Sequence, residues 1–401
     1  MFTFFVHNYC PFYKTGHATL KGRRFRSSPV ILSYFSCISL VFRFNLYYIV
    51  IIGKRLYIIF CKNKRKRIDL MATLKDVARL ACVDVSTVSR ALNNTSYVHP
   101  DTKARIFAAV KELSYQPNVL AQGLRQGKRH TIGVVVPRLH LTLFADITQS
   151  IESESRKLGY ATLICHTEDD PVIEKECLNR LRNGFVDGII IAGTGRNGHL
   201  LRDIHAGGIA VTQIVRKQEG TISSVIADYD ACGYDTVRYL YSRGCREIGL
   251  INGTTSLAPY RERYNGYHRA MEELGLTETC ATSPMPGNNF EYGYQCTEDL
   301  LNQNPDLDAI MAAVDIQGMA AIRALKDRKI RVPEQIRLVS LTGHSIGGLL
   351  ETTMTSLEIP AHEMGEKATH MVIDEIEAPS DNKPSVQHLV FSASLVERES
   401  S

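Results

Sequence analysis

Residues 71–118 have the sequence MATLKDVARLACVDVSTVSRALNNTSYVHPDTKARIFAAVKELSYQPN, which predicts three short helices with a helix-turn-helix at the front. Thr73 is placed to cap the first helix, with Asp76 three residues later in capping-box position. Asp84 can cap a second helix over 85–92, and a third helix should follow Pro100. Each helix has apolar residues at helical spacing on one face: Val77, Leu80 and Ala81, then Val88, Ala91 and Leu92, then Ile106, Ala109, Val110 and Leu113.

The second helix has an outward face that suits a DNA groove. Val85, Ser86 and Ser89 are short, and Arg90 can reach a guanine one turn later. A Ser- and Thr-rich helix with one Arg is, taken alone, more often an ordinary surface helix. The following helix favours the DNA interpretation because it offers three cations for phosphate groups, Lys103, Arg105 and Lys111.

Three blocks together are specific enough to indicate a family: DVARLACVDVSTVSRALNN, then YQPNVLAQGLR, then TIGVVVP. From about residue 71 to its C-terminus the chain resembles the lactose/galactose repressor family of bacterial transcription regulators. The resemblance implies a homodimer that binds a pseudo-palindromic DNA operator. It also implies a C-terminal core that binds a small effector, usually a sugar.

The resemblance assigns roles to individual residues of the predicted DNA-binding region. It places Val85, Ser86 and Arg90 at base-reading positions. It also places Leu124 on a hinge helix, where the leucine side chain inserts into the minor groove. The other members of this candidate set are expected to contact the DNA backbone or support the helices: Thr73, Thr87, Ser89, Asn93, Asn94, Asn118 and Ala121.

Three positions depart from the family pattern. Cys82 stands where a Gly is usual, so it must accept a positive φ or shift the turn. His99 replaces a Ser cap, which predicts a weaker start to the third helix. Gly123 lies inside the expected hinge helix and costs about 1 kcal/mol relative to Ala. We interpret these changes as tuning.

Charge is unevenly distributed along the chain. Residues 1–70 carry 13 Lys and Arg against one acidic residue, residues 71–130 carry nine against four, and residues 131–401 carry 25 against 37. A basic head on an acidic body is typical of a DNA-binding module joined to a body that does not bind DNA. Acidic bodies also favour solubility, which is compatible with this interpretation.

Residues 1–70 do not have the pattern of a domain. Their longest charge-free run, 27–42, has 16 residues, fewer than the roughly 20 that a bilayer span needs. The interpretation we favour is that translation starts at Met71 and that the preceding segment is not native. A membrane anchor and a disordered basic arm that contacts DNA are the alternatives.

In residues 131–401, apolar strands alternate with amphipathic helices, which predicts parallel sheets covered on both faces. The expected strands are 131–136, 160–165, 186–192, 208–214, 247–251, 282–285, 309–314 and 336–341. This length exceeds one compact sheet core, so two lobes are expected. The resemblance implies lobes of the periplasmic-binding-protein type, with chain crossings near Asp228, 356–360 and 383–386.

The predicted fold class is therefore α/β, with a small all-α head and a hinge helix before the two-lobed core. The corresponding domains are an extension at 1–70, a DNA-binding domain at 71–116, a hinge at 117–130 and an effector-binding and dimerisation core at 131–401. The sequence contains no long C-terminal heptad repeat, so tetramers through a coiled-coil tail are not expected.

Ligands of open α/β sheets bind beyond the carboxyl ends of the strands, here between the lobes. Leu143 and Phe144 follow the first strand, and Asp315 follows the IMAAVD strand. The family match adds Arg263 and Phe290, and it places Thr342 where the family usually has an Asp. Val215, beside Arg216, likewise replaces a common cleft Asp. Because of these replacements, the family pattern does not identify which sugar is the effector.

The sequence argues against other classes of protein. It has no P-loop, G-x-S-x-G or H-E-x-x-H motif, so we expect no enzymatic activity and no cofactor. Its ten Cys are scattered without a metal spacing, which indicates reduced thiols, no metal site and a cytoplasmic protein. The HTEDDP run, 166–171, is expected to be a solvent-facing helix start. A sugar-capture transport protein and a membrane-tethered regulator remain the alternative functions.

Overall fold

The computed structural model describes residues 40–44, 47–52, 55–60, 72–94, 96–115, 129–282, 290–379 and 381–401. The chain divides into two compact units, Met1–Pro117 and Asn118–Ser401. Within the described part of the chain, no helix combines the length and the apolar character needed to cross a bilayer. Because residues 116–128 lie outside the described residues, so do the expected hinge helix and its Asn118, Ala121 and Leu124.

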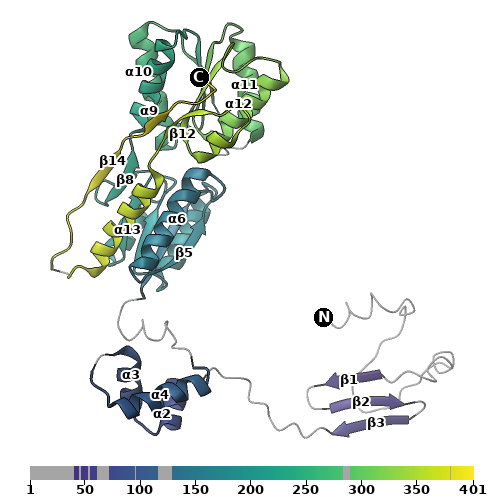
Figure 1. Ribbon diagram of the computed structural model, residues 1–401, viewed down its shortest axis with the longest axis vertical. Helices are drawn as coiled ribbons and strands as arrows, with labels where there is room; N and C mark the ends of the chain where they lie inside the picture. Colours follow the sequence, from purple (N-terminus) through teal and green to yellow (C-terminus); the bar gives the residue numbers. More distant parts are fainter. Residues whose placement is uncertain are drawn as a thin grey trace. The chain divides into compact units, whose positions relative to one another are not determined.

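The first unit contains two groups of elements. The strands β1 (Leu40–Phe44), β2 (Tyr47–Ile52) and β3 (Arg55–Phe60) form an antiparallel sheet. The predicted three-helix head follows as α2 (Leu74–Ala81), α3 (Val85–Asn93) and α4 (Pro100–Glu112), as Figure 1 shows.

The three helices of the head pack on a small apolar core. Val77, Val88 and Ile106 contribute one fully buried side chain from each helix. Cys82 adopts the left-handed conformation, with φ of 53°, and its N–H bonds back to the end of α2. Of the two outcomes expected for Cys82, a positive φ or a shifted turn, the structure has the positive φ. Leu80 was expected to face inward, but it is exposed because Val77, Ala78 and Ala81 fill the buried face of α2.

The second unit consists of two lobes, each built on a six-stranded sheet. The N-lobe sheet has the order β14-β8-β7-β6-β4-β5, and all its pairings are parallel. Its strands are β4 (Thr131–Val136), β5 (Ala161–His166), β6 (Gly188–Ile191), β7 (Ala210–Ile214), β8 (Ser224–Ala227) and β14 (His388–Phe391).

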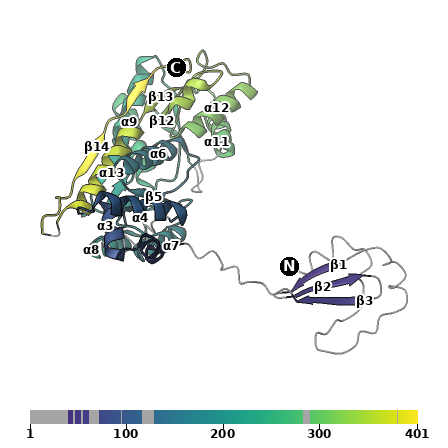
Figure 2. The same cartoon turned by 60° about the horizontal axis from the view of Figure 1, so that its bottom comes forward.

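Helices cover both faces of the N-lobe sheet. The helices α6 (Thr142–Lys157) and α13 (Ala361–Glu377) pack together on one face, and Figure 2 shows α13 beside β14. The helices α7 (Pro171–Arg182) and α8 (Gly198–Ala206) cover the other face through a separate apolar cluster. This layering is the predicted doubly covered parallel sheet.

The C-lobe sheet has the order β10-β9-β11-β12-β13-β15, and only its last pairing is antiparallel. Its strands are β9 (Ile248–Asn252), β10 (Thr279–Thr282), β11 (Ala309–Ala312), β12 (Arg337–Gly343), β13 (Thr355–Glu358) and β15 (Ser394–Val396). The helices α9 (Tyr229–Ser242) and α10 (Ala258–Leu274) cover one face, and α11 (Phe290–Gln303) and α12 (Asp315–Asp327) cover the other.

The chain crosses between the lobes three times. The first two crossings lie at Asp228 and between Glu358 and Ala361, where they were predicted. The third was expected at 383–386 but lies between Phe391 and Ser394. The prediction was wrong because β14 still pairs with β8 of the N-lobe, so the chain leaves that lobe only after Phe391.

Of the strand predicted at 282–285, residues 283–285 lie outside the described residues. Thr282 ends β10, Thr279–Thr282, which pairs in register with β9 from Gly249 to Asn252. The start of this strand was therefore not predicted, because its register is set by pairing with β9. The pattern also missed α8, α13, β8, β13, β14 and β15.

The helices α9 and α10 approach closely at two glycines. A methyl group at Gly266 would overlap the backbone oxygen of Asp230 and lie 2.8 Å from the backbone nitrogen of Tyr234. A methyl group at Gly233 would overlap the backbone oxygen of Arg263. Backbone atoms cannot rotate away, so any larger residue must push the two helices apart.

We expect Gly266→Ala to destabilise the second unit by about 2 kcal/mol, because overpacking outweighs the helix propensity gained from Ala. Gly220→Ala is the matched control, since no atom lies within 4 Å of the added methyl group. Thermal and urea denaturation measure both variants. Unfolding of Gly266→Ala at the wild-type midpoint would contradict the close contact.

Candidate functional site

The outward face of α3 carries the predicted DNA-reading residues. Val85, Ser86 and Arg90 are exposed and Ser89 is half-buried, while Val88 and Ala91 are buried on the opposite face. The structure thus leaves two short side chains and a guanidinium available to a base edge.

Hydrogen bonds at the ends of these helices fix their shape. Thr73 and Asp76 form the predicted capping box, in which Asp76 N donates to Thr73 Oγ1 at 3.4 Å and Thr73 N donates to Asp76 Oδ2 at 3.0 Å. The Thr73 hydroxyl also donates to Asp76 Oδ2 at 2.6 Å. Asp84 and His99 lie at the N-caps of α3 and α4 without a side-chain hydrogen bond to the helix. The weak cap at His99 was predicted, whereas a capping bond from Asp84 was expected and is absent at that position. Thr73 is therefore engaged in ordering α2.

The residues expected to support α3 bond within the head. Asn93 Nδ2 donates to Ser89 Oγ at 3.4 Å. Asn94 ends α3 in the left-handed conformation, and its Oδ1 accepts from Lys103 Nζ at 2.8 Å. Lys103, which was considered for phosphate contact, thus ties α4 to the end of α3. Thr87 is half-buried.

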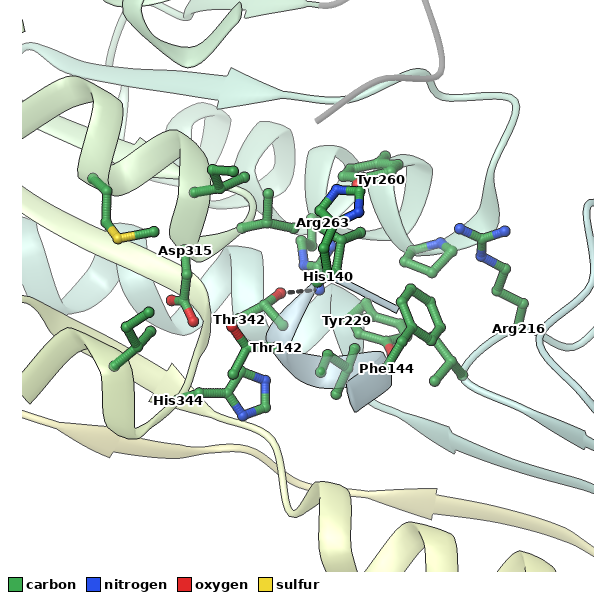
Figure 3. A pocket seen from close by; sticks show the side chains of 18 residues that line it. His140, Thr142, Phe144, Arg216, Tyr229, Tyr260, Arg263, Asp315, Thr342 and His344 are labelled. Atoms are coloured by element: carbon green, nitrogen blue, oxygen red, sulfur yellow. Dashed lines mark hydrogen bonds between the residues drawn. The ribbon is translucent and has the colours of Figure 1, made fainter. Parts of the chain in front are cut away.

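A cavity of about 110 Å³ lies between the two lobes of the second unit. Five of the six predicted effector residues line it: Leu143, Phe144, Arg263, Asp315 and Thr342. Phe290 does not line it; it begins α11 and is 38% exposed. Figure 3 shows the side chains of the cavity, which come from both lobes.

Arg263 is the central cation of the cavity. Its side chain projects from α10 and is only 2% exposed. One terminal nitrogen donates to Thr342 Oγ1, and the guanidinium carbon lies 4.5 Å from the centre of the Tyr229 ring and 5.7 Å from that of Tyr260. The Arg263 Nε has no hydrogen-bond partner. A ligand can therefore approach a cation that is already positioned and desolvated.

Asp315 lies at the start of α12, directly after β11, as the sequence predicted for a cleft carboxylate. Its Oδ1 accepts from the Ser340 hydroxyl at 2.9 Å, while its Oδ2 has no partner. Burial raises the pKa of Asp315 to about 7, although the Ser340 hydrogen bond opposes this. Near neutral pH this side chain can therefore either donate or accept a hydrogen bond.

His344 joins the two lobes beside the cavity. Its Nδ1 lies 3.1 Å from Asp146 Oδ2, and Asp146 belongs to α6 of the N-lobe whereas His344 follows β12 of the C-lobe. Burial lowers the pKa of His344, and the Asp146 carboxylate opposes this. Its Nε2 is buried without a partner.

Arg216 closes the N-lobe side of the cavity. Its Nη1 donates to Asp169 Oδ1 at 2.5 Å, and its guanidinium carbon lies 5.7 Å from the centre of the Phe144 ring. Glu168 and Asp170 of the HTEDDP run are exposed, as expected, whereas the Asp169 side chain is only 8% exposed and pairs with Arg216. Asp170 does cap α7, as a helix start should.

Sequence reasoning missed several residues that line the cavity: His140, Thr142, Tyr229, Tyr260 and His344. The hydroxyl group of Tyr229 is buried and has no partner. One signal could have found this residue, since Tyr229 directly follows the predicted crossing at Asp228. No group of His, Cys, Asp and Glu in the described ranges could hold a metal ion.

Comparison with known proteins agrees with both units. Residues 73–118 match the family model for bacterial regulatory proteins of the lacI family. Residues 237–401 match the model for a periplasmic binding protein-like domain.

Relatives align over most of their own length. The HTH-type transcriptional regulator RegA of Clostridium saccharobutylicum is 30% identical over 334 residues, which cover 82% of this chain and 99% of the relative. The ribose operon repressor of Halalkalibacterium halodurans is 27% identical over 307 residues, which cover 77% of this chain and 91% of the relative.

Among solved structures, a complex of the transcriptional regulator CelR with cellobiose aligns with a TM-score of 0.61 and 26% identity, covering 82% of this chain and all of that chain. The helix-turn-helix head, the two-lobed core and these relatives lead to one conclusion. This chain is a transcription regulator that belongs to the LacI family of bacterial regulatory proteins.

Proposed function

We propose that this regulator is a repressor that binds operator DNA as a homodimer and that a small molecule bound in the cleft between the core lobes controls its DNA affinity. The observation that carries the proposal is the set of buried polar atoms without partners in one cavity: Arg216 Nε, Tyr229 Oη, Arg263 Nε, Asp315 Oδ2 and His344 Nε2. Buried polar groups normally have hydrogen-bond partners, so a ligand is the natural source of them here.

The DNA-binding end acts through α3. In a dimer two such helices lie one DNA turn apart, about 34 Å, in successive major grooves. Val85, Ser86 and Arg90 would meet base edges, and Leu124 on a hinge helix would wedge into the minor groove. We assign 71–116 to the DNA-binding domain, 117–130 to the hinge and 131–401 to the core, with 1–70 as an extension outside all three.

The coupling between effector and DNA passes through the lobes. A ligand that contacts Phe144 from the N-lobe and Arg263 from the C-lobe favours one angle between them. That angle sets whether the two hinges of a dimer can pair. The coupling is reciprocal, so DNA changes effector affinity by the same factor.

The relatives support a carbohydrate effector, since one is named a ribose operon repressor and one structure contains cellobiose. We therefore propose control of carbohydrate-utilisation genes. A regulator of this kind must reach the DNA of the cell, so we propose that the protein is cytoplasmic. Its role requires no catalytic activity and no cofactor.

We expect Arg90→Ala to relax sequence preference at one base of each half-site, losing about 1–3 kcal/mol of discrimination there. Binding to a library of operator variants measures the effect. Arg105→Ala is the matched control because Arg105 is also exposed but lies on α4. It should weaken binding to all sequences equally. An unchanged sequence preference for Arg90→Ala would remove that residue from the base-reading set.

Variants of two tyrosines distinguish an effect on ligand binding from an effect on the stability of the fold. Tyr229→Phe deletes a buried hydroxyl group that has no partner, whereas Tyr267→Phe deletes one that donates to the backbone oxygen of Ile248 at 2.8 Å. We expect Tyr229→Phe to keep or raise the thermal midpoint and to weaken effector binding. Tyr267→Phe should lower stability by about 1 kcal/mol and leave binding unchanged.

Calorimetric titration against mono- and disaccharides, together with thermal denaturation, measures both tyrosine variants. DNA retention in gels, with and without the saccharides that bind, tests the control itself. The proposal fails if saccharides bind equally well to wild type and Tyr229→Phe and no saccharide that binds alters DNA retention.

A further inference from the structure

Arg263 is a buried cation of the cleft that forms no ion pair with any acidic residue of the described ranges. We propose that the ligand itself supplies the balancing charge, so that this cleft selects a small hydroxylated monocarboxylate, a sugar acid, over the corresponding neutral sugar. This inference rests on the proposed function, because it names the chemical class of the effector bound at the same site.

Arg263 makes no ion pair with any described residue within 4.0 Å. Two carboxylates around the cleft are engaged elsewhere, since Asp169 pairs with Arg216 and Asp146 pairs with His344. Asp315 accepts from the Ser340 hydroxyl, and Glu262 acts on Arg263 only through its charge, without a direct ion pair. The segment 283–289, which the structure does not describe, contains no Asp or Glu. The cation is thus buried without an acidic partner of its own.

Thr342 gives Arg263 a neutral partner. Its hydroxyl donates to the backbone oxygen of Ala313 at 2.9 Å and accepts from the guanidinium. The faces of Tyr229 and Tyr260 offset part of the cost of burying the charge. The two rings leave Arg263 Nε without a hydrogen-bond partner. Burying the cation therefore costs free energy unless an anion binds to it. A guanidinium matches the geometry of a carboxylate or a phosphate and can bind either through two hydrogen bonds.

The rest of the lining indicates hydroxyl groups on the same ligand. Tyr229 Oη, Asp315 Oδ2 and His344 Nε2 are buried and lack partners. The ring of Phe144 offers an apolar surface of the kind that packs against a sugar ring. Arg216 already has Asp169, so only one cation is left over, which fits a monoanion better than a phosphate dianion.

Matched pairs of sugars test the proposal directly. Calorimetric titration of the full chain with gluconate and glucose, glucuronate and glucose, and galacturonate and galactose compares each acid with its neutral partner. We expect at least one acid to bind at least about tenfold more tightly than its partner. Arg263→Met, which keeps the aliphatic stem, should abolish that preference. Tighter binding of glucose 6-phosphate than of every acid would overturn the monocarboxylate assignment.

A second pair of variants tests the unbalanced charge without any ligand. Thr342→Asp places a carboxylate beside Arg263, and Thr342→Asn has the same size without the charge. At pH 8 we expect Thr342→Asp to have a higher thermal midpoint than Thr342→Asn, and to bind the acids at least about tenfold more weakly than Thr342→Asn does. Equal or lower stability of Thr342→Asp would show that Arg263 needs no counter-charge and would overturn the proposal.

Acid binding should also depend on pH. Asp315, whose pKa is raised to about 7 by burial, is neutral below that pH and charged above it. Glu358 and Asp146 favour its neutral form, whereas Arg398 and the Ser340 hydroxyl favour its charged form. The charged form repels a carboxylate, so affinity for the acid should fall severalfold as pH rises through 7.

Two controls accompany the pH series. Affinity for the neutral sugar should stay level, because it carries no charge for Asp315 to repel. Asp315→Asn should remove the pH dependence of acid binding, since the amide does not ionise. A pH profile for the acid that Asp315→Asn leaves unchanged would contradict the placement of the carboxylate in this cleft.

The outcomes distinguish this inference from the proposed function. If neutral sugars bind as tightly as their acids, the inference is wrong and effector control by the cleft still stands. If no member of the panel binds, the Thr342→Asp and Thr342→Asn stabilities decide the inference. DNA retention by the same preparations reports separately on the regulator.

Discussion

The contact between α9 and α10 determines where the charge of the cleft lies. Gly233 and Gly266 let the two helix backbones touch, so the backbone of Arg263 is held against α9 without any side chain between them. Tyr229 begins α9 and Arg263 lies on α10, which is why the guanidinium lies over the tyrosine ring. Backbone contact therefore positions the cation, whereas a fully buried arginine is usually paired with an acidic residue.

Such positioning leaves the polar face of the cation available. A guanidinium held by a salt bridge must give up that bridge before it can bind an anionic ligand. Arg263 gives up nothing of the kind, because its neighbours are two aromatic rings and one hydroxyl group. Arg216, at the other side of the cleft, is the opposite case, since Asp169 neutralises it. The two arginines of one cavity thus have different roles.

The sequence predicted local features well, because short-range chemistry determines them. The capping box of Thr73 and Asp76 and the αL turn at Cys82 depend only on neighbouring residues. The strand at 131–136 was predicted with its observed bounds, since it is a continuous apolar run. Five of the six cleft residues were found because strand ends and the family pattern both point to the same edge of a sheet.

Features that depend on distant pairing were not predictable in this way. The position of β10 is set by its register with β9, and the third crossing is set by the pairing of β14 with β8. The partners of Asp169 and His344 lie 47 and 198 positions away along the chain. No local pattern identifies such a partner, so the ion pair of Asp169 and the cleft position of His344 were overlooked.

The last crossing has a consequence for the gene that encodes this chain. The strands β14 and β15 follow one another near the C-terminus, yet each is the edge strand of a different sheet. Ser400 is buried and its hydroxyl donates to the backbone oxygen of Leu338 in β12. A nonsense codon that removed only the residues from 388 onward would strip both lobes of a strand at once. Neither lobe can therefore be expressed as a single contiguous fragment, and late truncations should behave as null alleles.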